Sequence, residues 1–198
     1  MNKRGFSLLE LMVVVAIIAL FTTMVIPGVS SYFQISLNSA AREMATVIKE
    51  TYNSTIMTGR IHRIVFDIKK HTYWVESGPP TTLLETKESK EHEERKKKFL
   101  NSKNKSSPPS FDLEKSVTRK KIALPGKVEF EDIVTQQGPE PIYEGLAYAH
   151  FFPHGFTENT IIHLKDNSEH HASLVITPLI GRTELYERYM PSVEVFGK

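Results

Sequence analysis

The first feature that could do chemistry is a single carboxylate, Glu10, within an apolar N-terminal run. Lys3 and Arg4 precede this run, which covers residues 6–26, and no charged residue lies within residues 11–26. Removing a carboxylate from water costs at least a few kcal/mol unless a cation or donors compensate. Ionisable residues inside apolar segments are usually functional. Glu10 is therefore a candidate site residue in need of a cationic partner, and a simple anchor with a tolerated carboxylate is the alternative.

The eight histidines could supply metal ligands. His150 and His154 flank a predicted turn, His163 lies in a predicted strand, and His170 and His171 adjoin a predicted hairpin loop. Zinc needs three or four converging ligands, whereas strand alternation sends several of these side chains to different faces of a sheet. The sequence also contains no His-Glu-x-x-His, nucleophile elbow, phosphate loop or dinucleotide glycine motif. We expect no metal, no cofactor and no catalytic residue; an anchored periplasmic enzyme would require a pocket with perturbed titratable groups.

A long helix is expected to position Glu10. About 20 apolar residues are enough for a helix to cross a bilayer, and residues 6–26 meet that length. The two N-terminal cations, with no further basic residue until Arg42, place the N-terminus in the cytoplasm and the remainder outside. Pro27 removes one backbone donor, so a kink is expected there.

The helical pattern resumes after residues 28–31 and becomes amphipathic. Apolar residues recur at three- and four-residue spacing at Leu37, Ala41, Met44, Ile48, Tyr52 and Ile56. Gly59 is suited to cap the helix at its C-terminus. A continuous helix over residues 6–57 would be about 78 Å long. Its second half is expected to pack on a soluble domain.

Short apolar segments after Gly59 predict β-strands. They cover residues 61–68, 72–76, 126–134, 146–152, 159–164, 172–177 and 181–186. Polar turns at residues 69–71 and 166–168 make hairpins of two neighbouring pairs, and Trp74 is expected to be partly buried. This spacing is typical of an antiparallel sandwich. The predicted fold class is α+β, with a long N-terminal helix, transmembrane in its first half, packed on an antiparallel β-sandwich head.

Residues 78–121 interrupt the strand pattern. Lys and Glu dominate residues 85–105, and such a composition cannot bury enough apolar surface to offset its ordering entropy. We expect a charged flexible insert, either merely solvated or acting as a partner-docking arm. With 198 residues, a net charge of +2 and no cysteine, the chain fits one domain plus an anchor, held without disulfides and not strongly attracted to nucleic acid.

The N-terminus resembles a known signal. Gly5-Phe6-Ser7-Leu8-Leu9-Glu10 followed by a long apolar helix is similar to the type III signal sequence of type IV pilins and type II secretion pseudopilins. The resemblance implies cleavage between Gly5 and Phe6 by a prepilin peptidase, followed by N-methylation of Phe6. It also implies that Glu10 pairs with the new amino group of a neighbouring subunit during assembly. Pro27 matches the family's helix-bending proline.

A narrower resemblance lies near the C-terminus. Phe152-Pro153-His154-Gly155, residues 160–164 and residues 174–182 look like the C-terminal signature of H-type (GspH-like) pseudopilins and FimT-type minor pilins. In that family a Pro-x-x-Gly-Arg turn, here Pro178 to Arg182, joins the last two strands. His154 departs from the acidic residue that is common at its position.

Together the resemblances imply a division of the chain. Residues 1–5 would be the leader peptide, 6–27 the transmembrane and assembly helix, 28–58 its amphipathic continuation, and 59–198 the head with its insert at about 78–121.

The implied function is that of a minor pseudopilin, a structural subunit near the tip of the periplasmic pseudopilus of a type II secretion system, which assists protein export across the outer membrane. It would be a single-pass inner-membrane protein with a periplasmic head. Its partners would be the prepilin peptidase, the major and other minor pseudopilins, the inner-membrane assembly platform, and secreted cargo or the secretin. The alternative is a FimT-like minor pilin of a type IV pilus that contacts DNA.

Overall fold

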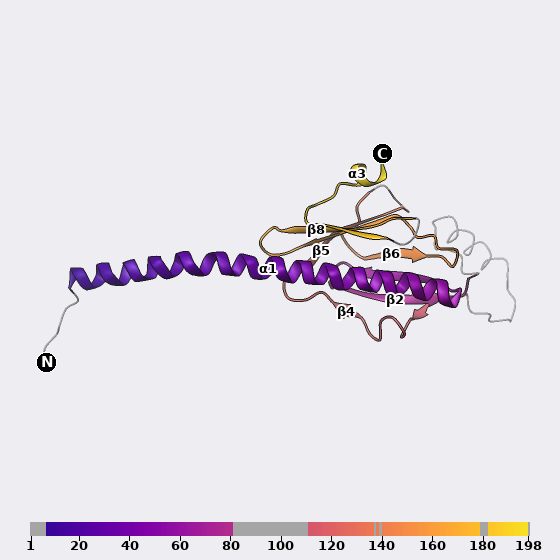
Figure 1. Cartoon of the computed structure of the whole chain (residues 1–198), viewed down its shortest axis with the longest axis horizontal. Coiled ribbons are helices and arrows are strands. Elements are labelled where there is room, and N and C mark those ends of the chain that lie inside the picture. The colour runs from indigo at the N-terminus through magenta and orange to yellow at the C-terminus, as the bar shows by residue number, and fades with distance from the viewer. Residues whose placement is uncertain (1–6, 81–110, 137, 139, 179–181, 198) are drawn as a thin grey trace, which may run out of the picture.

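A long helix and a β-sheet head make up the protein. The structure is a computed structural model that describes residues 7–80, 111–136, 138, 140–178 and 182–197, without the side chains of residues 23–34. Helix α1 (Leu8–Thr58) lies along the head with its second half and extends well beyond it toward the N-terminus (Figure 1). The first half of α1 therefore packs on no other helix or strand within the described part of the chain.

Helix α1 has a defined start and end. The Ser7 hydroxyl oxygen accepts a hydrogen bond from the Leu9 backbone N–H at 3.2 Å and so acts as the N-cap. At the other end, Gly59 adopts φ 64° and donates its N–H to the Thr55 carbonyl at 3.0 Å. This left-handed conformation favours glycine, as predicted. The 51 residues correspond to about 77 Å, and the helix continues through Pro27 without a break.

The predicted apolar stripe of α1 faces the head over most of its length. It is buried at Leu37, Ala41, Met44 and Ile48 and half-buried at Tyr52. Ile56, by contrast, is 46% exposed, so its assignment to the stripe was wrong.

Two threonines occupy the buried face of the last turns of α1. Thr51 and Thr55 are completely buried, and their hydroxyls donate to the carbonyls of Val47 and Thr51 at 2.7 Å. Each hydroxyl is satisfied within the helix itself. The end of the helix is therefore fitted to the head by small polar side chains instead of large apolar ones.

The first sheet contains five antiparallel strands. Its main strands are β1 (Ile61–Asp67), β2 (Thr72–Gly78) and β6 (Leu146–Phe151), and its short strands are β3 (Asp112–Leu113) and β4 (Ile122–Ala123). The order is β3-β2-β1-β6, and β4 also pairs with β2. The hairpin predicted around residues 69–71 is confirmed by the β1–β2 pairing. Trp74 on β2 is buried, more fully than predicted.

The second sheet contains four antiparallel strands in the order β5-β7-β8-β9. They are β5 (Glu129–Thr135), β7 (Thr160–Lys165), β8 (His171–Ile176) and β9 (Thr183–Tyr186), and the short helix α3 (Ser192–Phe196) follows. A bulge between Phe130 and Asp132 interrupts the regular alternation of side chains along β5.

One hydrophobic core joins α1 to both sheets. The rings of Phe66 on β1 and Phe130 on β5 meet edge to face with centroids 5.8 Å apart. Met44 and Ile48 of α1 belong to the same cluster. This arrangement confirms the predicted α+β class, a long helix on two antiparallel sheets.

The predicted insert is shorter at its C-terminal end than expected. Residues 81–110 lie outside the described residues, but residues 111–121 pack on the first sheet. β3 pairs with β2, and the buried Thr118 hydroxyl accepts the Val75 N–H at 2.9 Å. The Lys121 ammonium lies 3.7 Å from the centroid of the Trp74 ring. The insert boundary at residue 121 is therefore wrong, because side-chain contacts fix this polar segment.

The two turns of the C-terminal signature differ in how much of them is described. The chain reverses at residues 152–156, where Gly155 has φ +84° and the Phe152 N–H donates to the Phe156 carbonyl at 2.8 Å. The Pro178–Arg182 turn includes residues 179–181, which lie outside the described residues. At its ends, the Thr177 N–H and hydroxyl both donate to the Arg182 carbonyl at 3.1 Å.

Replacing Phe66 by alanine should lower the free energy of unfolding by about 3–5 kcal/mol, because the fully buried ring leaves a cavity. Urea unfolding followed by circular dichroism would measure the change. The control is Phe156→Ala, which removes a ring that is 53% exposed and should cost much less. Equal losses in the two variants would contradict the core assignment.

Candidate functional site

The start of α1 carries the residues for which chemistry was predicted. Glu10 lies in the first turn of α1, directly after the Ser7 cap, and its side chain is exposed. A carboxylate in a first helical turn is favoured by the helix dipole. Gly5 and Phe6 lie outside the described residues, so cleavage between them and methylation of Phe6 stay predictions. The side chain of Pro27 also lies outside the description, and its role and that of Glu10 in assembly stay predictions.

A continuous apolar surface surrounds Glu10. Large side chains along the first half of α1 are exposed, from Leu8 at 78% to Phe21 at 61%. Exposed apolar surface on this scale marks a site that a partner or lipid covers. Among the residues that the structure describes, no helix is long and apolar enough to cross a membrane. The predicted membrane span is not shown and remains a proposal.

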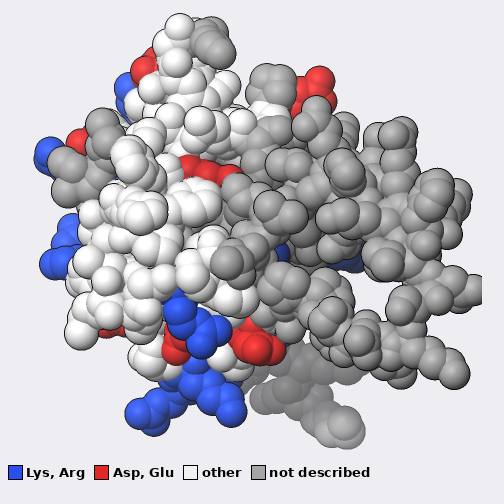
Figure 2. Space-filling model, turned by 90° about the vertical axis from the view of Figure 1, so that its right-hand side faces the viewer, with Lys and Arg blue, Asp and Glu red and all other residues white. Residues whose placement is uncertain are grey.

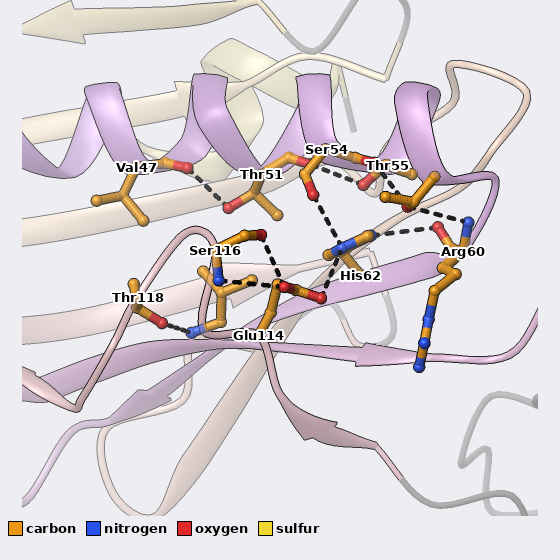
Figure 3. Close-up of polar contacts among 11 residues, drawn as sticks. Val47, Thr51, Ser54, Thr55, Arg60, His62, Glu114, Ser116 and Thr118 are labelled. Carbon is orange, nitrogen blue, oxygen red and sulfur yellow. Dashed lines mark hydrogen bonds and ion pairs between the residues drawn. The ribbon is translucent and has the colours of Figure 1, made fainter.

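A buried polar cluster lies where the C-terminal end of α1 meets β1 (Figure 3). His62 of β1 is fully buried between the helix and the segment that carries Glu114. Its Nε2 lies 3.3 Å from the Ser54 hydroxyl of α1 and 3.5 Å from Glu114 Oε2, and its Nδ1 lies 3.2 Å from the Arg60 carbonyl oxygen. The ring thus links three segments of the chain.

Burial sets the charge of this cluster. It lowers the pKa of His62 below its ordinary 6.5, and this effect outweighs the Arg60 carbonyl and the Glu114 charge, which raise it. For Glu114, burial raises the pKa. The hydrogen bonds from Ser116 and Ser77 lower it by more than burial raises it, so the pKa of Glu114 lies below its ordinary 4.5. A neutral His62 beside an ionised Glu114 is therefore the favoured state at neutral pH.

The cluster contains a serine, a histidine and a glutamate, but it lacks the order of a catalytic triad. In a triad the carboxylate holds one ring nitrogen and the nucleophile approaches the other. Here Ser54 and Glu114 both approach Nε2 of His62, while Nδ1 faces a backbone carbonyl. This geometry connects the helix to the sheet and does not activate Ser54.

The other candidate histidines pair with separate carboxylates. Each of four rings has one acidic partner within 2.9 Å, in the pairs His150–Glu158, His163–Asp132, His170–Asp166 and His171–Glu131. Within the described ranges, no group of three or more histidine, cysteine or acidic side chains could hold a metal ion. His154 is exposed at the turn that includes Gly155.

His163 is the most enclosed of these residues. Its Nδ1 lies 2.7 Å from Asp132 Oδ1 and its Nε2 lies 2.9 Å from the Met190 carbonyl. Both partners, a carboxylate and a backbone carbonyl, accept hydrogen bonds. Tyr189 stacks on the ring at 3.9 Å and donates to Asp132 Oδ2 at 3.2 Å. Burial and the Asp132 charge raise the pKa of Tyr189 to about 12.

Sequence analysis did not find the cluster around His62. Its members come from α1, β1 and the segment after β3, so no local spacing connects them. The available signal was a polar residue, His62, at a position that alternates with the apolar Ile64 and Phe66. That pattern indicates a buried hydrogen-bond partner, but it does not say which one.

Comparison with known proteins bears on the N-terminal segment. Residues 1–26 match the family described as "Prokaryotic N-terminal methylation motif". The chain carries a prepilin-type N-terminus. This finding confirms the resemblance to type IV pilins and pseudopilins on the segment that contains Gly5, Phe6 and Glu10. No curated protein matches the sequence.

One solved structure is similar to this prepilin-type chain. It is the minor pseudopilin EpsH from the Type 2 Secretion System of Vibrio cholerae, with a TM-score of 0.47 and 8% sequence identity over 77% of this chain and 97% of that chain. A likeness this remote carries no argument about function.

Acidification should weaken the fold through His62. Because its pKa is lower in the folded protein than the ordinary 6.5, the unfolded chain binds the proton more readily. The stabilising effect of the neutral ring is complete above pH 6.5 and is lost as the pH falls toward the folded pKa. Urea unfolding at pH 7.5 and 5.5 should therefore show a smaller loss of stability in His62→Gln than in the wild type.

The matched control is His154→Gln, which removes an exposed ring and should keep the wild-type pH dependence. Glu114 acts in a different window, since its pKa is lowered from 4.5 and its contribution is lost only as the pH falls below that value. An identical pH dependence in His62→Gln and the wild type would contradict the assignment.

Proposed function

We propose that the chain is a minor pseudopilin of a type II secretion system. The observation that carries the proposal is the combination of a prokaryotic methylation motif at residues 1–26 with a single 51-residue helix whose apolar first half extends out of the head. A helix of this kind needs to be covered by lipid before assembly and by neighbouring helices afterwards. The subunit would stand near the tip of the periplasmic pseudopilus and assist protein export across the outer membrane.

The mechanism is structural. The exposed apolar side chains between Leu8 and Phe21 would pack against the equivalent helices of neighbouring subunits. Cleavage after Gly5 would expose the amino group of Phe6, and Glu10 of an adjacent subunit would pair with it. Such a pair satisfies two groups that are costly to bury separately. The pair would set the axial register between helices that apolar packing alone leaves free to slide.

The partners and location follow from the same proposal. The prepilin peptidase would process the chain in the inner membrane, with the N-terminus in the cytoplasm and the head in the periplasm. The assembly platform and the major and other minor pseudopilins would incorporate it. The far end of the head would face further minor subunits, secreted cargo or the secretin.

The described charges give less support to a DNA-contacting minor pilin. On the face of the head in Figure 2, basic side chains gather at the lower edge, where acidic ones lie beside them, and others stand along the left edge. Arg63 pairs with Glu76 and Arg188 with Glu194, both at 2.8 Å. Binding to the DNA backbone requires an unneutralised row of basic residues. Within the described part of this face no such row is present.

Processing provides the deciding test of the proposal. Full-length chain expressed together with a prepilin peptidase should give a mature mass that begins at N-methylated Phe6, as measured by intact-protein mass spectrometry. Gly5→Leu should leave the chain uncleaved, because the resemblance implies that the peptidase needs a small residue there. Gly138→Ala, at a site with open space around the added carbon, is the matched control and should be processed normally. A mature chain that starts elsewhere would overturn the proposal.

Replacing Glu10 should separate membrane insertion from assembly. Glu10→Leu removes the carboxylate and leaves the neighbouring amine unpaired, at a cost of about 3–5 kcal/mol per buried contact. The variant should enter the membrane fraction normally but be depleted at least about tenfold from sheared filaments, as measured by immunoblotting. The control Glu50→Leu makes the same exchange at an exposed position in the second half of α1 and should be incorporated. Equal incorporation of both variants would exclude Glu10 as the register-setting group.

A further inference from the structure

A hollow lies between α1 and the first residues of β9. Its volume is about 470 Å³, and it is lined by Ala45, Thr46, Lys49, Tyr52, Asn53, Arg182 and Thr183. The helical residues recur at three- and four-residue spacing beside the buried stripe, so the hollow follows one face of α1. It lies on the head, away from the exposed apolar half of the helix.

Several polar side chains of the hollow have unused hydrogen-bonding atoms. The side chains of Lys49, Tyr52 and Asn53 have no hydrogen-bond or ion-pair partner among the described residues. The Thr183 hydroxyl oxygen is buried and also has no partner in the described part of the chain. Leaving a buried polar atom unsatisfied is costly, and such atoms are rare in folded proteins. Because this oxygen has almost no accessible surface, the donors that a ligand can reach are those of Lys49, Asn53 and Arg182.

The charge of the hollow is positive. Lys49 and Arg182 are its two charged lining residues among those described, and no carboxylate lines it. Glu184 lies next to it and contacts Arg182 Nε at 3.4 Å, but it also accepts the Tyr186 hydroxyl at 2.7 Å. The terminal nitrogens of the Arg182 guanidinium, a group with five N–H donors, therefore remain available.

These donors define the chemistry of a ligand. Ammonium and guanidinium groups only donate, and the amide and hydroxyl groups can also donate. The complement is a compact anion that only accepts, and a carboxylate accepts a guanidinium in a bidentate manner. The Ala45 methyl group and the Tyr52 ring add apolar surface, which suits the methylene groups of an acidic side chain.

We propose that the hollow between α1 and β9 binds a carboxylate side chain of an acidic peptide segment from a partner protein. A nucleic acid would need a longer basic track than two cations provide. A free inorganic anion would make no use of the apolar lining. This inference goes beyond the proposed function and does not rest on it, since the hollow belongs to the head and its occupancy requires neither cleavage nor methylation.

The test uses the full-length chain, labelled with ¹⁵N, in micelles of an uncharged detergent. Acetyl-tetraglutamyl-amide is the probe and acetyl-tetraglutaminyl-amide its neutral counterpart, and both are titrated by NMR. The acidic peptide should cause saturable shifts in the Asn53 side-chain amide and in Arg182 Nε–H. The neutral peptide should cause none. Saturable shifts located elsewhere on the head would overturn the proposal.

A double variant tests the charged contacts. Lys49→Gln with Arg182→Gln should weaken binding by at least about tenfold, since hydrogen bonds to charged groups are among the stronger ones. The matched control is Lys69→Gln with Arg119→Gln, which removes the same charges from two exposed positions and should bind like the wild type. Equal weakening in both double variants would show a general charge effect and overturn the site.

The Thr183→Val exchange keeps the shape and the net charge of the hollow. Because the hydroxyl is closed to solvent and has no partner in the unliganded protein, the variant should unfold at the same temperature as the wild type or higher and bind the peptide like the wild type. Weakened binding would show that the affinity does not come from the exposed cations and would overturn the proposed contacts. If inorganic phosphate or a single-stranded oligonucleotide produced the same shifts at lower concentration than the peptide, the carboxylate assignment would be overturned.

Discussion

Between α1 and the two sheets, the side chains of Leu37, Met44 and Ile48 are almost completely enclosed. This packing holds the helix to the head. Helices are only marginally stable in isolation, and in proteins they gain most of their stability by burying one face. The sheets also depend on it, since the inward faces of β1 and β8 meet α1 in the same core. The first half of the helix is directed outward only because the second half is fixed.

Polar contacts complete this attachment in a chain without cysteine. The cluster around His62 joins the end of α1 to β1 and to the segment after β3, and His163 joins the second sheet to the residues before α3. In both places the histidine contacts segments that are distant in sequence. Buried polar groups of this kind are costly when one partner is removed, so they restrict how the elements can be arranged.

The spacing of apolar residues predicted the helix and the strands that are long enough to show a regular pattern. Helix α1, its cap at Gly59 and the seven longer strands follow from apolar spacing and turn residues. The short β3, β4 and α3 were not predicted, because two strand residues or five helical residues are too few to show the period of a strand or of a helix. The segment before Lys121 was assigned to the insert because it is polar. Its order comes from contacts such as Thr118 with Val75, which no sequence window contains.

The candidate sites also differ in whether the sequence alone could reveal them. The prepilin-type segment could be recognised because its residues are consecutive. The hollow beside β9 could not, since Lys49 and Thr183 are brought together only by the packing of α1 on the second sheet. Ile56 was wrongly predicted to be buried. Its spacing fits the apolar stripe of α1, but the fold buries the neighbouring Thr55 instead.

The uninterrupted course of α1 has a mechanical consequence. The helix has no break between Leu8 and Thr58, and its second half is packed in the core. A displacement of the first half of α1 along its axis would therefore be passed to the head through the contacts of side chains such as Leu37, Met44 and Ile48.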